Sequence, residues 1–465
     1  MLRRLISCSR MVPQDLVCGA LPSSREGYRT VIQIAWPCII ETLLVCGITF
    51  VDMIMVSVVG SAAIAAVGIT TQPKFILLAT IMSLNIGVTA VVSRRFGQKD
   101  QAGANRCLKQ CLVICCTLSL LLSGLGYFFA EPFLAFAGAE PSYLQAAADY
   151  FRVIMVGQFF YGLALTINAA QRGCGNTRIS MTTNIAANIV NLTLNYFLIY
   201  GIGPFPRLEV LGSGIATAMG QLAAFLLALF SLLRKNGYLK LSFPVLWKPD
   251  KSTLSGVFRI GTSALAEQLF VRIGFLFYAK IVAGLGSTAF ATHQICLNIS
   301  NISFSLGDGF AMAAAALVGQ CLGSRRPDLS KLYGSICQRL AFLCSTVLAA
   351  VFFFGRYGLI RLFSREPAIL ASGAAIMIVL TCVTHIQTSQ VIFSGCLRGA
   401  GDAKYTALTS LFSIALFRPT MTWLLCYPAG FGVLGAWLAF FLDQTIRIVF
   451  YGLRFQSGKW MEISL

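Results

Sequence analysis

Apolar residues run through this chain in twelve long stretches, separated by short polar connections. Each stretch is long enough for an α-helix to cross a hydrocarbon core of about 30 Å. Because backbone N–H and C=O groups find no partner in lipid, such stretches are predicted to be helices. The predicted spans are 30–57, 66–92, 107–130, 145–170, 178–201, 210–233, 254–283, 290–318, 330–355, 367–394, 403–427 and 431–454. We therefore expect an all-α membrane protein with twelve transmembrane helices.

The pattern of the first half recurs in the second half at a fixed distance of 226 positions (267 − 41, 286 − 60, 398 − 172). Near the end of the chain the offset falls to 223. A parallel repeat of six spans predicts two pseudo-symmetric six-helix bundles, related by an axis along the membrane normal. The repeated pairs include Glu41 with Glu267, Gly60-Ser61 with Gly286-Ser287, Arg172-Gly173-Cys174-Gly175 with Arg398-Gly399-Ala400-Gly401, and Leu211-Gly212 with Leu434-Gly435.

The repeat and the longest polar connection divide the chain into lobes. We expect a cytoplasmic N-terminal tail, an N-lobe of six helices, a cytoplasmic linker, a C-lobe of six helices and a short cytoplasmic C-terminal tail. These segments are 1–28, 29–233, 234–252, 253–455 and 456–465.

Composition excludes a soluble protein, because only 11% of the residues are charged and 57% are hydrophobic, whereas soluble domains have about 25% charged residues. The net charge of +19 does not predict a nucleic-acid partner, since most Lys and Arg lie in the connections between spans. They concentrate in alternate connections, with the stretch 356–365 as the main exception. This bias places both termini and the linker in the cytoplasm. We expect the protein to lie in the cytoplasmic (inner) cell membrane.

The first span contains two acids and a proline. Glu41 and Asp52 are eleven positions apart, so on a helix they share a face about 16 Å apart. Pro37 is expected to bend the helix near Glu41, because it cannot donate a backbone hydrogen bond. An ionised side chain at the bilayer centre costs at least ~2.5–3.5 kcal/mol, so each acid requires a partner or a function. Cation or proton binding is the functional interpretation, and structural ion pairs are the alternative.

The fifth span carries an asparagine ladder with spacings of 4, 3 and 4 residues, which puts all four amides on one helix face. Amides are costly in lipid, so this face should line protein or a water-filled cavity. The ladder could bind Na⁺, orient a carboxylate or join helices. Thr217 and Gln221 of the sixth span are expected to line the same lobe. The ladder consists of Asn184, Asn188, Asn191 and Asn195.

The second half also places acids within apolar spans. Arg272 is five positions from Glu267 and therefore on a different helix face, so the partner of Glu267 should come from another helix. Asp443 and Arg447 are spaced i,i+4 and are expected to pair on one helix. Asp308 has no assigned role. Tyr161, Gln387 and Gln390 are candidates for a cavity that receives amphipathic cations.

These features resemble the multidrug and toxic compound extrusion (MATE) family, in its prokaryotic type. The resemblance covers the chain from about residue 28 and depends on several motifs in a fixed order. They are Pro37…Glu41…Phe50-Val51-Asp52-Met53, Val59-Gly60, Ser93-Arg94-Arg95-Phe96-Gly97, Arg172-Gly173-Cys174-Gly175-Asn176-Thr177-Arg178, Ala291-Thr292-His293-Gln294 and Leu397-Arg398-Gly399-Ala400-Gly401-Asp402.

The resemblance implies an antiporter that exports small organic cations in exchange for H⁺ or Na⁺ by alternating access. It implies coupling at Asp52 and Asn191, with Na⁺ as one possible ion there. Asn195 stands where many members have a second Asp, which removes one titratable group from the site. Glu267 resembles the seventh-span acid of one bacterial subgroup, although it is not at the same turn as the acid of the sodium-coupled type, and it is a further candidate for cation or proton coupling. No cofactor and no resident metal are expected, and the protein is expected to act as a monomer in the bilayer.

Two alternatives remain open from the sequence. A lipid-linked oligosaccharide flippase of the same superfamily usually has more spans and a basic cavity, whereas this chain has acids in both lobes. A membrane-embedded enzyme requires a convergent catalytic constellation, and the two histidines are far apart. Asp52 has Tyr278 as its counterpart at +226, and the ladder is unmatched too. The sequence therefore predicts that the breaks in the repeat lie in the first half and mark the coupling site.

Overall fold

Long α-helices make up nearly all of the fold, as the apolar stretches predict. The computed structural model describes residues 8, 11–57, 59, 61–202, 205–234, 237–241 and 250–463. The long helices are α2 (Ser24–Ser57), α3 (Ser61–Gly97), α4 (Gln101–Phe128), α6 (Pro141–Gly173), α7 (Thr177–Tyr200), α8 (Glu209–Leu233), α9 (Lys251–Ala283), α10 (Ser287–Gly323), α11 (Pro327–Phe354), α13 (Pro367–Ala400) and α16 (Gly432–Gln456). The eleventh predicted span is built from α14 (Ala403–Ser410), a π-helix (Leu411–Phe417) and α15 (Arg418–Cys426).

Four short helices complete the described elements. They are η2 (Gln14–Leu16), α5 (Ala130–Phe136), α12 (Arg356–Arg361) and η4 (Lys459–Glu462). Within the described ranges, ten helices are long and apolar enough to cross a membrane. The two other predicted spans, α7 and α9, carry the asparagine ladder and Glu267, respectively. Together with α7 and α9, the ten account for the twelve spans of a multi-pass membrane protein.

The helix boundaries reproduce the sequence repeat. α3 and α10 begin 226 positions apart (287 − 61) and end 226 positions apart (323 − 97). α4 and α11, and α6 and α13, keep the same offset (327 − 101, 367 − 141). α8 and α16 are offset by 223 (432 − 209). The duplication inferred from single residues therefore extends to whole helices.

The chain forms two compact units. The N-terminal unit is Leu43–Phe258, and the C-terminal unit combines Met1–Thr42 with Arg259–Leu465. α2 contributes to both units. Its first part packs with the C-terminal helices, where the Thr42 hydroxyl donates to the Ser305 carbonyl at 2.7 Å. The N-terminal unit thus starts within α2, whereas the sequence placed the start of the N-lobe at residue 29.

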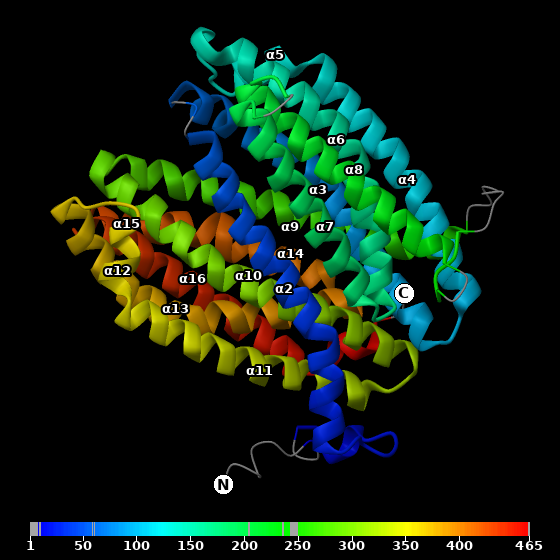
Figure 1. Ribbon diagram of the computed structural model, residues 1–465. Helices are drawn as coiled ribbons and strands as arrows, with labels where there is room; N and C mark the ends of the chain where they lie inside the picture. The colour runs from blue at the N-terminus through cyan, green and yellow to red at the C-terminus, as the bar shows by residue number, and fades with distance from the viewer. Residues whose placement is uncertain are drawn as a thin grey trace. The chain divides into compact units, whose positions relative to one another are not determined.

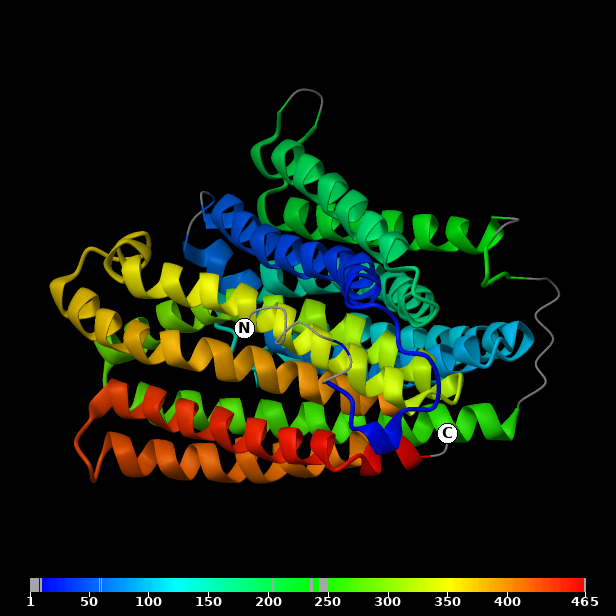
Figure 2. The same ribbon diagram turned by 90° about the horizontal axis from the view of Figure 1, so that it is seen from below.

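The same packing pattern occurs inside each unit (Figure 1). In the N-terminal unit α6 packs against α3, α4 and α8, and in the C-terminal unit α13 packs against α10, α11 and α16. Figure 2 shows α16, in red, running beside the orange α14–α15 segment, which it contacts along α15. Since α13 and α6 occupy equivalent places, each is the central helix of its unit.

The repeated Arg-Gly-x-Gly motif ends these two central helices. A Cβ on Gly399 would lie 2.6 Å from the Ala315 Cα atom of α10, so only glycine permits this close approach. The second glycine of each copy, Gly175 or Gly401, has a positive φ of 80° or 94°. This left-handed conformation costs a residue with a Cβ about 1–2 kcal/mol. The motif is therefore explained by helix packing and helix termination.

Candidate ion-coupling site

Asp52 lies in the second part of α2, half-buried within the N-terminal unit. The side-chain amide of Asn195 on α7 donates to its Oδ1 atom at 2.8 Å. A hydrogen bond to a carboxylate is charge-assisted and contributes about 1.5–3 kcal/mol. The asparagine ladder and the acid of the first span are separate signals in the sequence, and the structure joins them through the contact of Asn195 with Asp52.

Asn191 extends this contact to α8. Its amide lies 3.2 Å from the Thr217 hydroxyl and 3.4 Å from the Asn195 Nδ2 atom. With the Asn191 amide turned over, its nitrogen donates to Asp52 Oδ1 at 3.0 Å and its oxygen accepts from Thr217. The amide orientation is decided by the hydrogen-bond network, and this orientation satisfies both neighbours. Asp52, Asn191, Asn195 and Thr217 form what we call the Asp52 cluster.

One buried oxygen of the Asp52 cluster has no hydrogen-bond partner among the described residues. It is the Oδ1 atom of the fully buried Asn195. Carboxylate and amide oxygens are the ligands that hard cations prefer. The described residues contain no group of three His, Cys, Asp or Glu side chains suited to a metal. The chemistry available here is thus protonation of Asp52 or reversible binding of a small hard cation by oxygen atoms.

Two further groups interact electrostatically with Asp52, and neither was among the residues predicted for the site. They are Lys74 on α3 and the buried Tyr150 on α6. The Lys74 ammonium lies 5.6 Å from the centre of the Phe75 ring. A signal for Lys74 was present, because a lysine within an apolar span is itself a functional candidate. Tyr150 has no comparable signal, since a tyrosine in such a span is usually packing.

The remaining candidates of the N-terminal unit lie outside the Asp52 cluster. Asn184 donates to the Ser180 carbonyl of its own helix at 3.1 Å. Asn188 is half-buried on α7. Gln221 of α8 lies against Gly157 of α6, and Tyr161 is half-buried on α6. Of the four ladder asparagines, the structure thus brings two to Asp52.

The other predicted acids belong to the C-terminal unit. Glu41 is buried in the first part of α2. Glu267 of α9 is also buried and accepts a hydrogen bond from the Thr406 hydroxyl of α14 at 2.9 Å. A partner from another helix was predicted for Glu267, and this is confirmed, although the partner is a hydroxyl group. Gln387 and Gln390, predicted to line a cavity, are both buried on α13.

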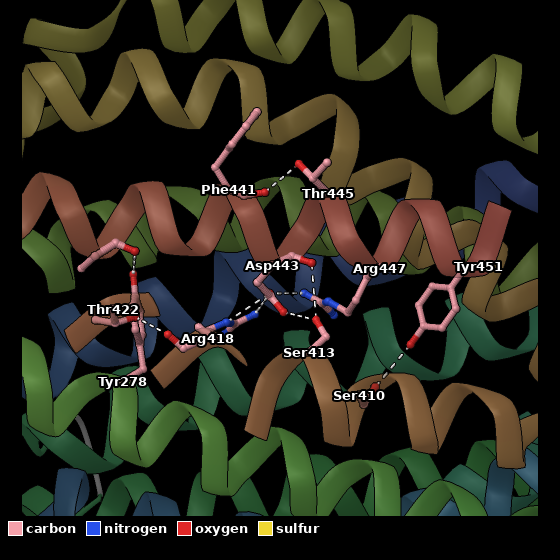
Figure 3. Close-up of polar contacts among 11 residues, drawn as sticks. Tyr278, Ser410, Ser413, Arg418, Thr422, Phe441, Asp443, Thr445, Arg447 and Tyr451 are labelled. Carbon is pink, nitrogen blue, oxygen red and sulfur yellow. Dashed lines mark hydrogen bonds and ion pairs between the residues drawn. The ribbon is translucent and has the colours of Figure 1, made fainter. Parts of the chain in front are cut away.

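Figure 3 shows a buried ion cluster in the C-terminal unit. Asp443 of α16 accepts from Arg418 Nε at 3.1 Å and from Arg447 Nη2 at 3.2 Å, and Ser413 also donates to it. The predicted pairing of Asp443 with Arg447 is confirmed. Asp443 and Arg418 are 0% exposed, and the Arg418 guanidinium lies 4.7 Å from the centre of the Phe275 ring. We call Ser413, Arg418, Asp443 and Arg447 the Asp443 cluster.

The π-helix contributes to the Asp443 cluster. Ser413 lies within it and Arg418 follows it directly. A π-helix is rare and widens the helical turn, which changes the direction of the side chains that follow it. Arg418 reaches Asp443 on the adjacent helix α16, 25 positions away in sequence. The cluster is thus built by local backbone geometry as well as by residue type.

Comparison with known proteins agrees with this architecture. The sequence matches the MatE family over residues 37–197 and 264–424, one match in each half. It is 26% identical to "Uncharacterized transporter YisQ" of Bacillus subtilis, covering 95% of this chain and 97% of that protein. It is also 26% identical to "Multidrug resistance protein PmpM" of Pseudomonas aeruginosa, covering 85% and 84%.

The fold is shared with solved structures as well. One solved structure, described as "Crystal structure of MATE in the straight conformation", superposes on this chain with a TM-score of 0.87 at 19% identity. The superposition covers 93% of this chain and 97% of the other. Such a likeness shows the two-lobe fold. Because the family match spans more than half of the sequence, the chain belongs to the MatE family of membrane transporters and is not an enzyme.

Proposed function

We propose that the protein is an antiporter that exports amphipathic organic cations, with inward movement of H⁺ or Na⁺ through the Asp52 cluster as the driving force. The observation that carries the proposal is the Asp52 carboxylate, which accepts from Asn195 Nδ2 at 2.8 Å. The Oδ1 atom of the same amide is buried and has no hydrogen-bond partner among the described residues. The names of several relatives, including PmpM, describe multidrug resistance proteins. We further propose that the protein acts as a monomer in the cytoplasmic membrane, with both termini in the cytoplasm.

The mechanism follows from the charge of Asp52. As an ionised carboxylate it accepts hydrogen bonds from α7, which link α2 to the ladder helix. Proton or Na⁺ binding neutralises the carboxylate and changes those hydrogen bonds. A ligand shifts a conformational equilibrium by as much as its affinity differs between the two states. Ion binding at Asp52 would therefore favour one side of the alternating-access cycle and substrate binding the other.

The test is efflux of a cationic dye from proteoliposomes, with a pH gradient and a Na⁺ gradient imposed separately. One gradient should drive efflux, and Asp52→Asn should abolish the driven efflux while the protein stays folded. Asp149→Asn is the matched control, because this acid is 45% exposed and pairs with Arg152 at 2.9 Å. Normal driven efflux by the Asp52→Asn variant would contradict the coupling role of Asp52.

A further inference from the structure

Polar side chains follow one face of α10 in the C-terminal unit. Their spacings of 4, 3, 4 and 3 residues keep them on a single helix face. Three are exposed and two are half-buried. This set, which we call the α10 polar stripe, consists of Gln294, Asn298, Asn301, Ser305 and Asp308.

The neighbours of Asp308 are packed on both sides. A Cβ on Gly309 would lie 2.6 Å from the Ile39 Cα atom of α2. A Cβ on Gly307 would lie 3.4 Å from Thr388 of α13, in ordinary contact. Asp308 itself is exposed, and the described residues give it no hydrogen bond or ion pair within 4 Å. Its carboxylate is therefore presented on the open face between two packed faces.

This open face is unsuited to lipid. Asp308 lies 21 residues after the start of α10 and 15 before its end (308 − 287, 323 − 308), which places it well inside the span. A carboxylate at the bilayer centre costs at least ~2.5 kcal/mol, and each unpaired amide adds to the cost. The neighbouring α11 shows the opposite pattern, because its exposed residues Leu343 and Val347 are apolar. The α10 polar stripe therefore requires polar surroundings, whereas the exposed face of α11 suits lipid.

The repeat shows that the fold does not need this charge. The counterpart of Asp308 in the first copy is Met82 (308 − 226), which is 43% exposed on the equivalent helix α3. Both copies form helices with equivalent boundaries. The carboxylate is thus an addition to one copy of a shared scaffold, which favours a role in binding.

We propose that the α10 polar stripe lines a water-filled surface that binds the transported organic cation, with Asp308 as the carboxylate that pairs with its positive charge. This inference rests on the proposed function. The exposed amides can donate and accept hydrogen bonds, and the half-buried Met312, one turn beyond Asp308, adds an adaptable apolar contact. A carboxylate beside amides and a thioether suits a cation that carries one charge on an apolar body.

Binding of tetraphenylphosphonium to the purified protein tests the charge pairing. Asp308→Asn should weaken binding by about tenfold, equivalent to about 1.4 kcal/mol, and Asp308→Glu should retain most of it. The matched control is Glu131→Gln, an acid 47% exposed on α5, which should bind as the unmodified protein does. Unchanged affinity in Asp308→Asn would overturn this inference alone. If the unmodified protein neither binds nor exports the cation, the proposed function fails as well.

Labelling of single cysteines tests the water-filled surface independently. The background replaces the exposed Cys18, Cys344 and Cys382 by Ser. A charged methanethiosulfonate reagent should modify Asn301→Cys and leave Val347→Cys, at a position 67% exposed, unmodified. Tetraphenylphosphonium should protect Asn301→Cys, and adding Asp308→Asn should remove that protection. Equal labelling at both positions, or protection that persists without Asp308, would overturn the inference.

Discussion

Replacing Asp443 by Asn should destabilise the C-terminal unit by about 3–5 kcal/mol, because it leaves two buried guanidinium groups without their shared carboxylate. Asp443 and Arg418 are both 0% exposed, and Arg447 lies 3.2 Å from the same carboxylate oxygen. Breaking a buried pair costs far more than breaking a surface pair, since the remaining charge is uncompensated. In a unit of about 250 residues, 1 kcal/mol moves the Tm by about 2–4 °C. The Tm should therefore fall by roughly 6–20 °C.

Thermal unfolding in detergent, followed with a fluorogenic maleimide, measures this change. The cysteines Cys296 and Cys426 are buried in the C-terminal unit and become reactive when it unfolds. Adding Arg418→Met to Asp443→Asn should recover part of the loss, because it removes one of the two stranded charges.

The control for the Asp443 cluster is a surface acid. Asp149→Asn removes an exposed ion pair with Arg152, which contributes at most about 1 kcal/mol. A fall in Tm for Asp443→Asn no larger than that for Asp149→Asn, or a deeper loss on adding Arg418→Met, would contradict the stabilising role of the buried carboxylate.

Three further predictions concern single residues. Asn195→Ala removes both a hydrogen-bond donor to Asp52 and an amide oxygen. The half-maximal ion concentration for efflux should therefore shift about tenfold or more, towards tighter binding of H⁺ or weaker binding of Na⁺. An unchanged dependence on both ions would exclude Asn195 from the site. Lys74→Gln removes a positive charge that acts on Asp52. Binding of the coupling ion should therefore tighten by about 1 kcal/mol, measured by the same efflux titration. Weaker ion binding in this variant would contradict the prediction. Gly401→Ala should lower the free energy of unfolding by about 1–2 kcal/mol, since φ is 94° at this position. The control Gly452→Ala, at an uncrowded helical position, should leave the Tm nearly unchanged. Equal Tm values for the two variants would argue against backbone strain at position 401.

The sequence predicted the architecture well because its signals are regular. Apolar length predicts helices, and the constant offset of 226 predicts duplicated bundles, whose helix boundaries then match. The helices extend beyond the predicted spans, as with 66–92 against Ser61–Gly97, because helical structure continues where the apolar residues end. The division of α2 between two units depends on packing with distant helices, such as the contact of Thr42 with Ser305, which periodicity does not encode.

The candidate site was predicted in part. Helical spacing placed Asn191 and Asn195 on one face, and both reach Asp52. Lys74 was not predicted as part of the site because its span, 66–92, contains no acid, so helical spacing does not connect it with Asp52. The prediction that the breaks in the repeat lie only in the first half is wrong. Asp308 stands opposite Met82, so the second copy also departs from the first.

The contact of Arg418 with Asp443 could not be predicted from the sequence. It depends on a π-helical segment, Leu411–Phe417, whose wider turn alters side-chain direction and has no simple sequence pattern. At the position equivalent to Asp52, the C-terminal unit has Tyr278, which is fully buried and donates to the Ala436 carbonyl at 3.1 Å. The second copy thus has packing and an internal ion cluster where the first copy has its candidate coupling site.

Coupling at Asp52 is tested most directly by measuring ion movement itself. A gradient of a cationic dye is imposed across proteoliposomes that hold a pH-sensitive or Na⁺-sensitive fluorophore, and the counter-flow of each ion is recorded. Dye movement should drive the opposite movement of H⁺ or Na⁺, and Asp52→Asn should remove this ion flux while Asp149→Asn preserves it. Dye transport with neither ion moving, or an equal ion flux in Asp52→Asn, would contradict coupling at Asp52.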